Sequence, residues 1–176
     1  MIEPNLYFST PIWHLKKDLP FGSVDWALDF EKNTPTTTSS RSSRGGYQTE
    51  VYNEKFKYST HLDNCLKFLP RFEYLNWWLN INRKGDFNMS HTHPNTDLAC
   101  VWYITDNYNL LAFTNPLGHE RFKLIKQTSN PNQLYFYKDA KAGDIIMFPG
   151  DLPHHVEPHE LDTPRISVSF NIKFVD

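Results

Sequence analysis

The chain has 176 residues, 39% of them hydrophobic and 15% aromatic, which is enough to build one domain around a substantial core and excludes extensive disorder. The formal net charge of −2 argues against binding to bulk nucleic acid, and no run approaches the roughly 18 apolar residues of a membrane-spanning helix. Two cysteines without a CxxC pair argue against a disulfide framework and against a thiolate zinc site. Since the sequence does not open on a charged region leading into an apolar stretch, we expect a cytoplasmic protein.

The N-terminal part predicts an edge strand, a loop and a helix. Residues 6–13 are apolar but contain Pro11, which favours a strand at the edge of a sheet. Residues 33–46 are rich in Thr, Ser, Arg and Gly and predict a flexible loop, either simply solvated or a lid that orders on substrate binding. The next segment has apolar residues at helical spacing, namely Leu62, Cys65, Leu66 and Leu69. We therefore expect a helix within residues 58–72, ending near Pro70.

From residue 74 onward the sequence has the character of β-structure, with short apolar or alternating runs separated by Gly, Pro, Asn and Asp. About eight strands are expected. Their approximate positions are 75–82, 87–93, 98–105, 110–113, 134–137, 145–148, 155–157 and 165–174. This order favours a mainly β domain of residues 1–176, in which one or two helices within residues 1–75 support a two-sheet β-barrel.

Two histidine-bearing segments predict a divided metal site. His91 and His93 lie two positions apart, so in a strand both side chains would point to one face, about 7 Å apart. A third histidine, His154, follows the apolar strand expected at 145–148. Three imidazoles suit iron, zinc or copper and leave coordination positions open for substrate or oxygen, as a catalytic site requires. His155 should point to the opposite face of its strand.

These segments resemble a known family. The matching runs are HTHP at 91–94, AGDIIMFPGDLPHH at 142–155 and RISVSFN at 165–171. They resemble the double-stranded β-helix oxygenases that use Fe(II) and 2-oxoglutarate, most closely a bacterial and phage branch distantly related to prolyl 4-hydroxylases. The resemblance spans about residues 76–174. It implies a jelly-roll, cupin-like catalytic core in that range, a location in a bacterium or a phage-infected cell, and hydroxylation of a C–H bond by molecular oxygen with release of succinate and CO2.

The family pattern contains a His-x-Asp/Glu pair, a distal histidine and a basic residue about ten positions further. By this resemblance His91 and His154 bind Fe(II), whereas His93 stands where a carboxylate is expected. Either His93 is the third ligand, as in three-histidine iron enzymes, or Asp97 supplies the carboxylate and His93 lies behind it. An imidazole in place of a carboxylate removes one negative charge, so the ferrous ion would be less neutralised.

The resemblance also implies where the co-substrate binds. Arg165 corresponds to the basic residue that holds the distal carboxylate of 2-oxoglutarate, and a guanidinium can do so with two parallel hydrogen bonds. Ser167, on the same face of the strand, can donate another. Tyr103, Asn80 and Asn82 lie where the family contacts this co-substrate. A purely structural hydrogen bond is an equally good explanation for the two asparagines.

The substrate is less defined by the sequence. Arg41, Arg44 and Asp151 are candidate contacts at the mouth of the site, and analogy with prolyl hydroxylases suggests a peptide or a small molecule. Two other functions stay open: a three-histidine cupin-type metalloenzyme that does not use 2-oxoglutarate, and a non-catalytic binding or assembly module on the same barrel. Because exposed edge strands of such barrels can pair, a homodimer is compatible with the sequence.

Overall fold

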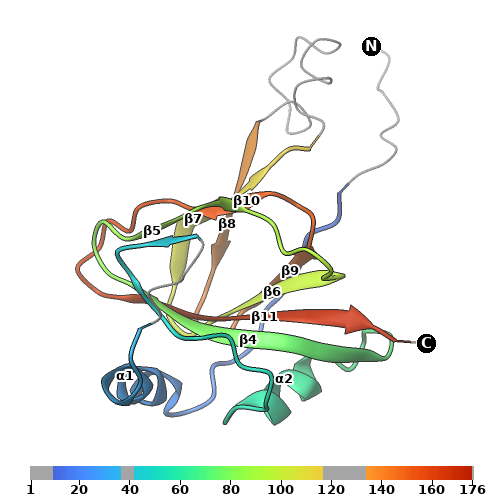
Figure 1. Cartoon of the computed structure of the whole chain (residues 1–176), viewed down its shortest axis with the longest axis horizontal. Helices are drawn as coiled ribbons and strands as arrows, with labels where there is room; N and C mark the ends of the chain where they lie inside the picture. Colours follow the sequence, from blue (N-terminus) through green and yellow to red (C-terminus); the bar gives the residue numbers. More distant parts are fainter. Residues whose placement is uncertain (1–9, 37–41, 117–133, 176) are drawn as a thin grey trace.

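The computed structural model describes residues 10–36, 42–116 and 134–175, which form two antiparallel sheets packed face to face (Figure 1). The six-stranded sheet has the order β1 (Trp13–Leu15), β9 (Ile145–Pro149), β6 (Leu98–Tyr103), β11 (Arg165–Phe174), β4 (Phe72–Asn82) and β3 (Tyr47–Gln48). The five-stranded sheet has the order β2 (Ser43–Arg44), β5 (Phe87–His91), β10 (His154–Val156), β7 (Asn107–Thr114) and β8 (Tyr135–Ala140). The predicted mainly β, two-sheet architecture is confirmed.

Two helices in the described residues, α1 (Ser23–Asn33) and α2 (Ser59–Cys65), lie below the six-stranded sheet in Figure 1 and cover its outer face. Ala27 of α1 and Leu62 of α2 are fully buried against the apolar residues that the sheet turns outward. Neither helix is long and apolar enough to span a membrane.

Strand β6 explains why one stretch of sequence is apolar without interruption. Its even-numbered residues, such as Trp102, pack towards the helices, whereas its odd-numbered residues, such as Val101 and Tyr103, pack between the two sheets. All six residues of the strand are buried. A strand with a core on each face has no solvated side, so the usual alternation with polar residues is absent.

In strands β4 and β11, side chains that face the helices alternate with side chains that face the space between the two sheets. Ile166, Val168 and Phe170 of β11 are fully buried in the core beneath the helices. The alternate residues of both strands face the space between the sheets, and they form the cross-strand pairs Asn82–Arg165, Asn80–Ser167, Trp78–Ser169 and Asn76–Asn171. The interior of the barrel is therefore polar along this row, in contrast to the apolar interior lined by β6, β7 and β9.

The N-terminal elements differ in part from the sequence expectations. An edge strand, β1, pairs with β9, but it overlaps the segment predicted at 6–13 only at Trp13, and residues 6–9 of that segment lie outside the described part. The helix expected within 58–72 stops at Cys65. One further turn follows, in which the N–H of Leu69 donates to the carbonyl oxygen of Leu66, before Pro70, which disfavours helical backbone at the preceding residue. Helix α1 was not located by sequence because Gly22 at its N-cap makes no side-chain capping bond. Within the loop expected at 33–46, residues 43–44 form the short strand β2, and residues 37–41 lie outside the described part.

Candidate active site

Three histidines converge between the sheets. His91 ends β5 and His154 begins β10, directly opposite each other in the register of the two strands. His91, His93 and His154 each present one ring nitrogen, and these three atoms lie within 4.8 Å of one another. Among the described residues this is the one group of three or more His, Cys, Asp or Glu side chains with that arrangement. The geometry agrees with a single ion held by three imidazoles.

The hydrogen bonds of two of these rings determine which nitrogen faces the centre. The Nδ1 atom of His91 lies 2.8 Å from the carbonyl oxygen of Met89, and that of His154 lies 2.9 Å from the carbonyl oxygen of Leu152. A carbonyl only accepts, so each Nδ1 carries the proton and each Nε2 presents a lone pair. Such bonds to the far nitrogen are the usual way in which proteins orient a histidine that binds metal.

The third ring is oriented by two asparagines. His93 Nδ1 donates to Asn171 Oδ1 at 2.8 Å, and Asn171 Nδ2 donates to Asn76 Oδ1 at 2.9 Å, which keeps the oxygen of Asn171 turned towards the ring. The Trp78 ring stacks on His93 with centroids 5.6 Å apart. The Nε2 atoms of His93 and His154 are then 3.3 Å apart without a proton between them. Two facing lone pairs repel unless a cation lies between them, which is the clearest sign that this site is built for a metal ion.

His93 reaches the centre although strand β5 ends at His91. The chain turns through Pro94 and Asn95, which has a φ of 62°, a left-handed conformation that asparagine tolerates. The backbone N–H of His93 donates to the carbonyl oxygen of Gly150 at 2.7 Å. The in-strand spacing expected for the two histidines is therefore replaced by a turn held against the β9–β10 connection.

Gly150 is required by this close approach. A Cβ atom on Gly150 would lie 2.3 Å from the carbonyl oxygen of Thr96 and 2.9 Å from that of His93. We expect Gly150→Ala to push the His93 loop away from β10, lowering the free energy of unfolding by about 1–3 kcal/mol and the affinity for divalent metal at least tenfold. Urea denaturation and metal titration measure the two effects. Gly85→Ala is the control, because no atom lies within 4 Å of its Cβ position and only the cost of its positive φ remains; equal metal affinity in the two variants would contradict this role of Gly150.

The three histidines are in the neutral form that metal binding requires. Burial lowers the pKa of His91, and burial together with the neighbouring His91 lowers the pKa of His93 to about 4. Burial, followed by the other two histidines, lowers the pKa of His154 well below its ordinary value. All three rings are therefore neutral near pH 7, the form that coordinates metal.

Asp97, the alternative carboxylate ligand, lies elsewhere. Its side chain is exposed, and its Oδ2 atom accepts a hydrogen bond from the backbone N–H of Phe174 at 2.7 Å. It does not belong to the group of three converging histidines. The structure therefore brings His93 to the centre and uses Asp97 to hold the end of β11.

Arg165 is a buried cation beside the histidines. It is 3% exposed, its Nε donates to Asn107 Oδ1 at 2.7 Å, and its Nη1 donates to Asn82 Oδ1 at 3.0 Å. A longer contact of 3.5 Å joins Nη1 to Ser167 Oγ. Within the described part of the chain no Asp or Glu forms an ion pair with it. A buried guanidinium without a carboxylate is costly, so this position indicates an anionic ligand.

Tyr103 supports the same conclusion. The Arg165 guanidinium carbon lies 5.4 Å from the centre of the Tyr103 ring, and the buried hydroxyl group has no hydrogen-bond partner of good geometry among the described residues. Burial raises the pKa of Tyr103, while the nearby guanidinium opposes this shift, so the phenol keeps its proton. A buried hydroxyl without a partner normally marks a bound molecule or water.

The cavity between these groups connects the candidate metal ligands to Arg165. His91, His93, His154, Asn80, Ser167 and Arg165 all line it. Asn80 Nδ2 donates to Ser169 Oγ at 3.1 Å, while Asn82 and Asn107 accept from Arg165. The enclosed space is about 40 Å³, and four of its lining residues also line an open groove of about 950 Å³ on the outer side of the histidines. A ligand can therefore reach the histidines from the groove.

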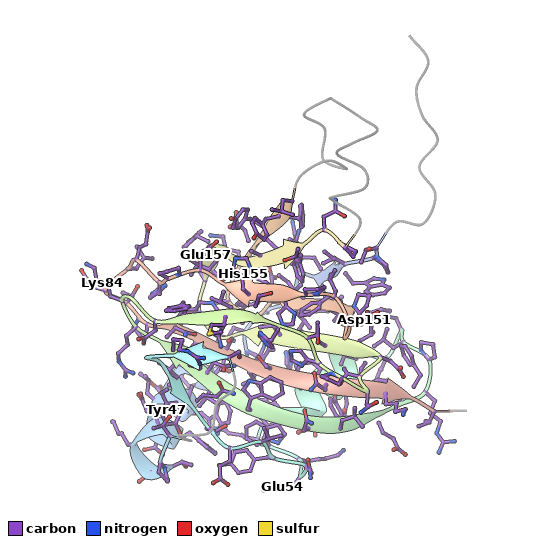
Figure 2. All side chains as sticks on the ribbon, turned by 45° about the horizontal axis from the view of Figure 1, so that its top comes forward. Tyr47, Glu54, Lys84, Asp151, His155 and Glu157 are labelled. Atoms are coloured by element: carbon purple, nitrogen blue, oxygen red, sulfur yellow. The ribbon has the colours of Figure 1, made fainter. Side chains whose placement is uncertain are left out.

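Of the predicted substrate contacts in the described part of the chain, neither Arg44 nor Asp151 lines this cavity. Arg41 lies outside the described residues, and Arg44 is exposed on β2, where its Nη1 donates to the carbonyl oxygen of Ser43. Asp151 is exposed in the turn before β10 (Figure 2). His155 points away from the centre, as expected, and its Nε2 lies 3.1 Å from Glu157 Oε1 beside it (Figure 2).

Sequence reasoning missed three asparagines that orient the main groups. Asn171 and Asn76 hold His93, and Asn107 holds Arg165. The alternation in the run from Arg165 to Asn171 does place Asn171 on the same face as Arg165, so that signal was available. The sequence contains no comparable signal for Asn107, because the polar residues around it are typical of a turn.

Known proteins resemble this chain in family and in fold. The family model described as "Putative 2OG-Fe(II) oxygenase" matches residues 76–171. A prolyl-4-hydroxylase from Pseudomonas putida has a TM-score of 0.64 at 12% identity, covering 96% of this chain and 95% of that one. HygX from Streptomyces hygroscopicus, with nickel and 2-oxoglutarate bound, has a TM-score of 0.63 at 12% identity over 94% and 84% of the two chains. The α-ketoglutarate-dependent epimerase SnoN has a TM-score of 0.68 at 13% identity over 94% and 78%.

These structural likenesses show that the fold is the double-stranded β-helix, as the sequence predicted. No curated protein sequence matches the chain. The stretch matched by the family model runs from Asn76 to Asn171 and contains the three histidines and Arg165. Because it makes up more than half of the 176 residues, the chain belongs to the 2OG-Fe(II) oxygenase family.

Proposed function

We propose that this protein hydroxylates a C–H bond of a small molecule or a peptide, with Fe(II) held by His91, His93 and His154 and 2-oxoglutarate held by Arg165. Fe(II) and 2-oxoglutarate are the cofactors of the family. The residues fit both groups. Three Nε2 lone pairs face one point, and the buried guanidinium of Arg165, which has no acidic partner among the described residues, lies beside the buried phenol of Tyr103.

The side chains of the protein position the metal and the co-substrate and shield them from water. Molecular oxygen is the oxidant of this chemistry: bound iron would activate it, 2-oxoglutarate would give up two electrons as it is converted to succinate and CO2, and the C–H bond would supply the other two. The carbonyl groups of Met89 and Leu152 hold two imidazoles in place, and Asn171 holds the third. Arg165 anchors the distal carboxylate of the co-substrate, and Tyr103 donates a hydrogen bond to it.

Apolar side chains on one side of the cavity limit the amount of water that it can hold. Leu111 and Phe148 are buried at 1% and 0% exposure and line it together with Val156. Since the enclosed space is about 40 Å³, room for about three water molecules, binding of 2-oxoglutarate displaces water and shifts side chains at the mouth. In such a site the electrostatic interactions of the co-substrate with Arg165 are stronger than in water.

One observation favours this proposal over a metalloenzyme that does not use 2-oxoglutarate and over a non-catalytic binding module. Arg165 is buried beside the three histidines without an acidic partner in the described part of the chain. A three-histidine metalloenzyme that does not use 2-oxoglutarate needs no such cation, and a binding module needs neither the cation nor three lone pairs turned towards one point. An oxo-acid co-substrate accounts for both features.

The test is oxygen-dependent turnover of 2-oxoglutarate. The purified protein, loaded with Fe(II) under anaerobic conditions, is mixed with 2-oxoglutarate and air, and succinate is measured. Even without the organic substrate we expect slow succinate formation that requires both iron and oxygen. Fully loaded protein that binds 2-oxoglutarate but forms no succinate would rule out the oxygenase reaction. Candidate small molecules and peptides are then screened for faster succinate release and for a mass increase of one oxygen atom.

Tyr103→Phe separates the co-substrate contact from a structural role. Because the hydroxyl group has no good partner in the described structure, its removal should not lower the free energy of unfolding. The affinity for 2-oxoglutarate should fall about three- to tenfold, as expected for one lost hydrogen bond. Thermal denaturation and calorimetric titration of the metal-loaded protein measure the two effects. A destabilised variant with unchanged affinity would show that the hydroxyl serves the fold.

A further inference from the structure

The cavity at the candidate metal centre is unusual in its charge. No Asp or Glu stands among the described residues that line it. Arg165 contributes one positive charge, and the three histidines are neutral ligands. The thiol of Cys100 packs on the helix side of β6, and burial raises its pKa well above the ordinary value, so Cys100 adds no negative charge to the cavity.

Acidic residues near the site are engaged elsewhere. Asp97 accepts from the backbone of Phe174, Asp144 is bound to His14 at 2.7 Å, and Glu157 lies against His155. The groove outside the histidines holds exposed Glu50, but Lys173 also lines it. No described carboxylate is therefore left to balance a cation inside the cavity.

The charges of the loaded site can be added. A divalent metal and Arg165 bring three positive charges, and 2-oxoglutarate brings two negative ones, which leaves one positive charge in excess. A carboxylate ligand at position 93 would reduce this sum to zero. Because the cavity walls are largely buried, such an excess is poorly screened and attracts a further anion.

Resting on the proposed function, we infer that the loaded cavity binds one further monoanion next to the metal, and that His93 creates this site by replacing a carboxylate. The chemistry is that of a small anionic donor, either the carboxylate of an organic substrate or a free halide ion. This narrows the substrate class, since an organic substrate that binds here carries a single negative charge close to the carbon that reacts.

The test uses Co(II) as a spectroscopic probe in the full-length protein. Co(II)-loaded protein is saturated with 2-oxoglutarate, and its visible absorption is followed during titration with sodium formate or sodium chloride at constant ionic strength. We expect saturable spectral changes, with an apparent Kd at least tenfold lower in the wild type than in His93→Asp. A tenfold change corresponds to about 1.4 kcal/mol.

A second variant keeps the three histidines. Asn171→Asp leaves an oxygen acceptor for His93 Nδ1 but adds a negative charge behind the ring, and Asn76 can turn its amide nitrogen towards it. Anion affinity should fall in this variant too, and it is compared with that of the wild type at matched saturation with Co(II) and 2-oxoglutarate. Asn33→Asp is the charge-matched control. It adds the same charge at the exposed end of α1, outside the six-stranded sheet, and should leave anion affinity unchanged.

The outcomes distinguish this inference from the proposed function. A wild-type protein whose spectrum does not respond to 2-oxoglutarate overturns the proposed function and the anion site with it. A normal response to 2-oxoglutarate, followed by no anion binding or by equal affinity in wild type, His93→Asp and Asn171→Asp, overturns the anion site alone. Tighter binding of formate than of chloride identifies the organic carboxylate as the source, and the reverse order identifies a halide.

Discussion

His154→Ala is expected to abolish stable iron binding, reducing the bound metal from about one ion per chain to less than about a tenth after dialysis. His154 supplies one of three converging nitrogens, and two imidazoles without a third ligand hold a divalent ion weakly. Succinate formation from 2-oxoglutarate should be lost as well. Metal analysis after anaerobic reconstitution and the succinate assay measure the two losses.

The neighbouring residue provides a matched control. His155 sits one position further on the same strand, points away from the centre and contacts Glu157. His155→Ala should therefore keep its iron and its turnover within about twofold of the wild type, as expected for a substitution away from the site. Because His154 also packs edge-on against Phe148 at 4.6 Å, its removal costs about 1–3 kcal/mol of stability. Circular dichroism must show that the variant is folded; a folded His154→Ala protein that retains iron would refute the three-histidine centre.

Arg165→Met should raise the Kd for 2-oxoglutarate by a factor of about 30 or more while iron binding is retained. The reason is the loss of a buried, charge-assisted pair, which typically costs about 2–5 kcal/mol. Methionine fills much of the same volume and removes the charge. Calorimetric titration of 2-oxoglutarate into metal-loaded protein measures the effect, and metal analysis shows that the histidines are still in place.

Two further variants make this result specific. Arg165→Lys keeps the charge without the planar fork, so its affinity for 2-oxoglutarate should lie between those of wild type and Arg165→Met. Arg83→Met removes an exposed guanidinium that pairs with Glu31 at 2.7 Å, and it should change nothing at the site. If Arg165→Met bound 2-oxoglutarate as tightly as the wild type, the co-substrate would have to be anchored by another group.

Much of the fold and part of the site could be predicted from the alternation of polar and apolar residues along short stretches of the sequence. The run from Arg165 to Asn171 alternates polar and apolar residues, and the structure places its apolar set beneath the helices and its polar set in the cavity. The strand from Asn76 to Asn82 repeats this pattern on its neighbour. A period of two residues is a property of the extended chain itself, so it is visible in sequence without knowledge of the partner strand.

The contacts that orient the functional groups could not be read in this way. Asn171 binds His93 across 78 positions, and Asn107 binds Arg165 across 58. Gly150 was not recognised as a contact of the His93 loop, because its lack of a side chain matters only where two turns meet.

The sequence by itself indicated the candidate donor types, namely three histidines and an arginine, with a histidine at position 93 where the family pattern has a carboxylate and Asp97 as the alternative, together with the strands that carry them. Only the tertiary structure decided that His93 rather than Asp97 reaches the centre, that each imidazole turns Nε2 inward, and that Arg165 is buried without an acidic partner in the described residues. The physical reason is that donor chemistry belongs to single residues. Orientation and charge balance, in contrast, are sums over neighbours that the chain brings together only when it folds.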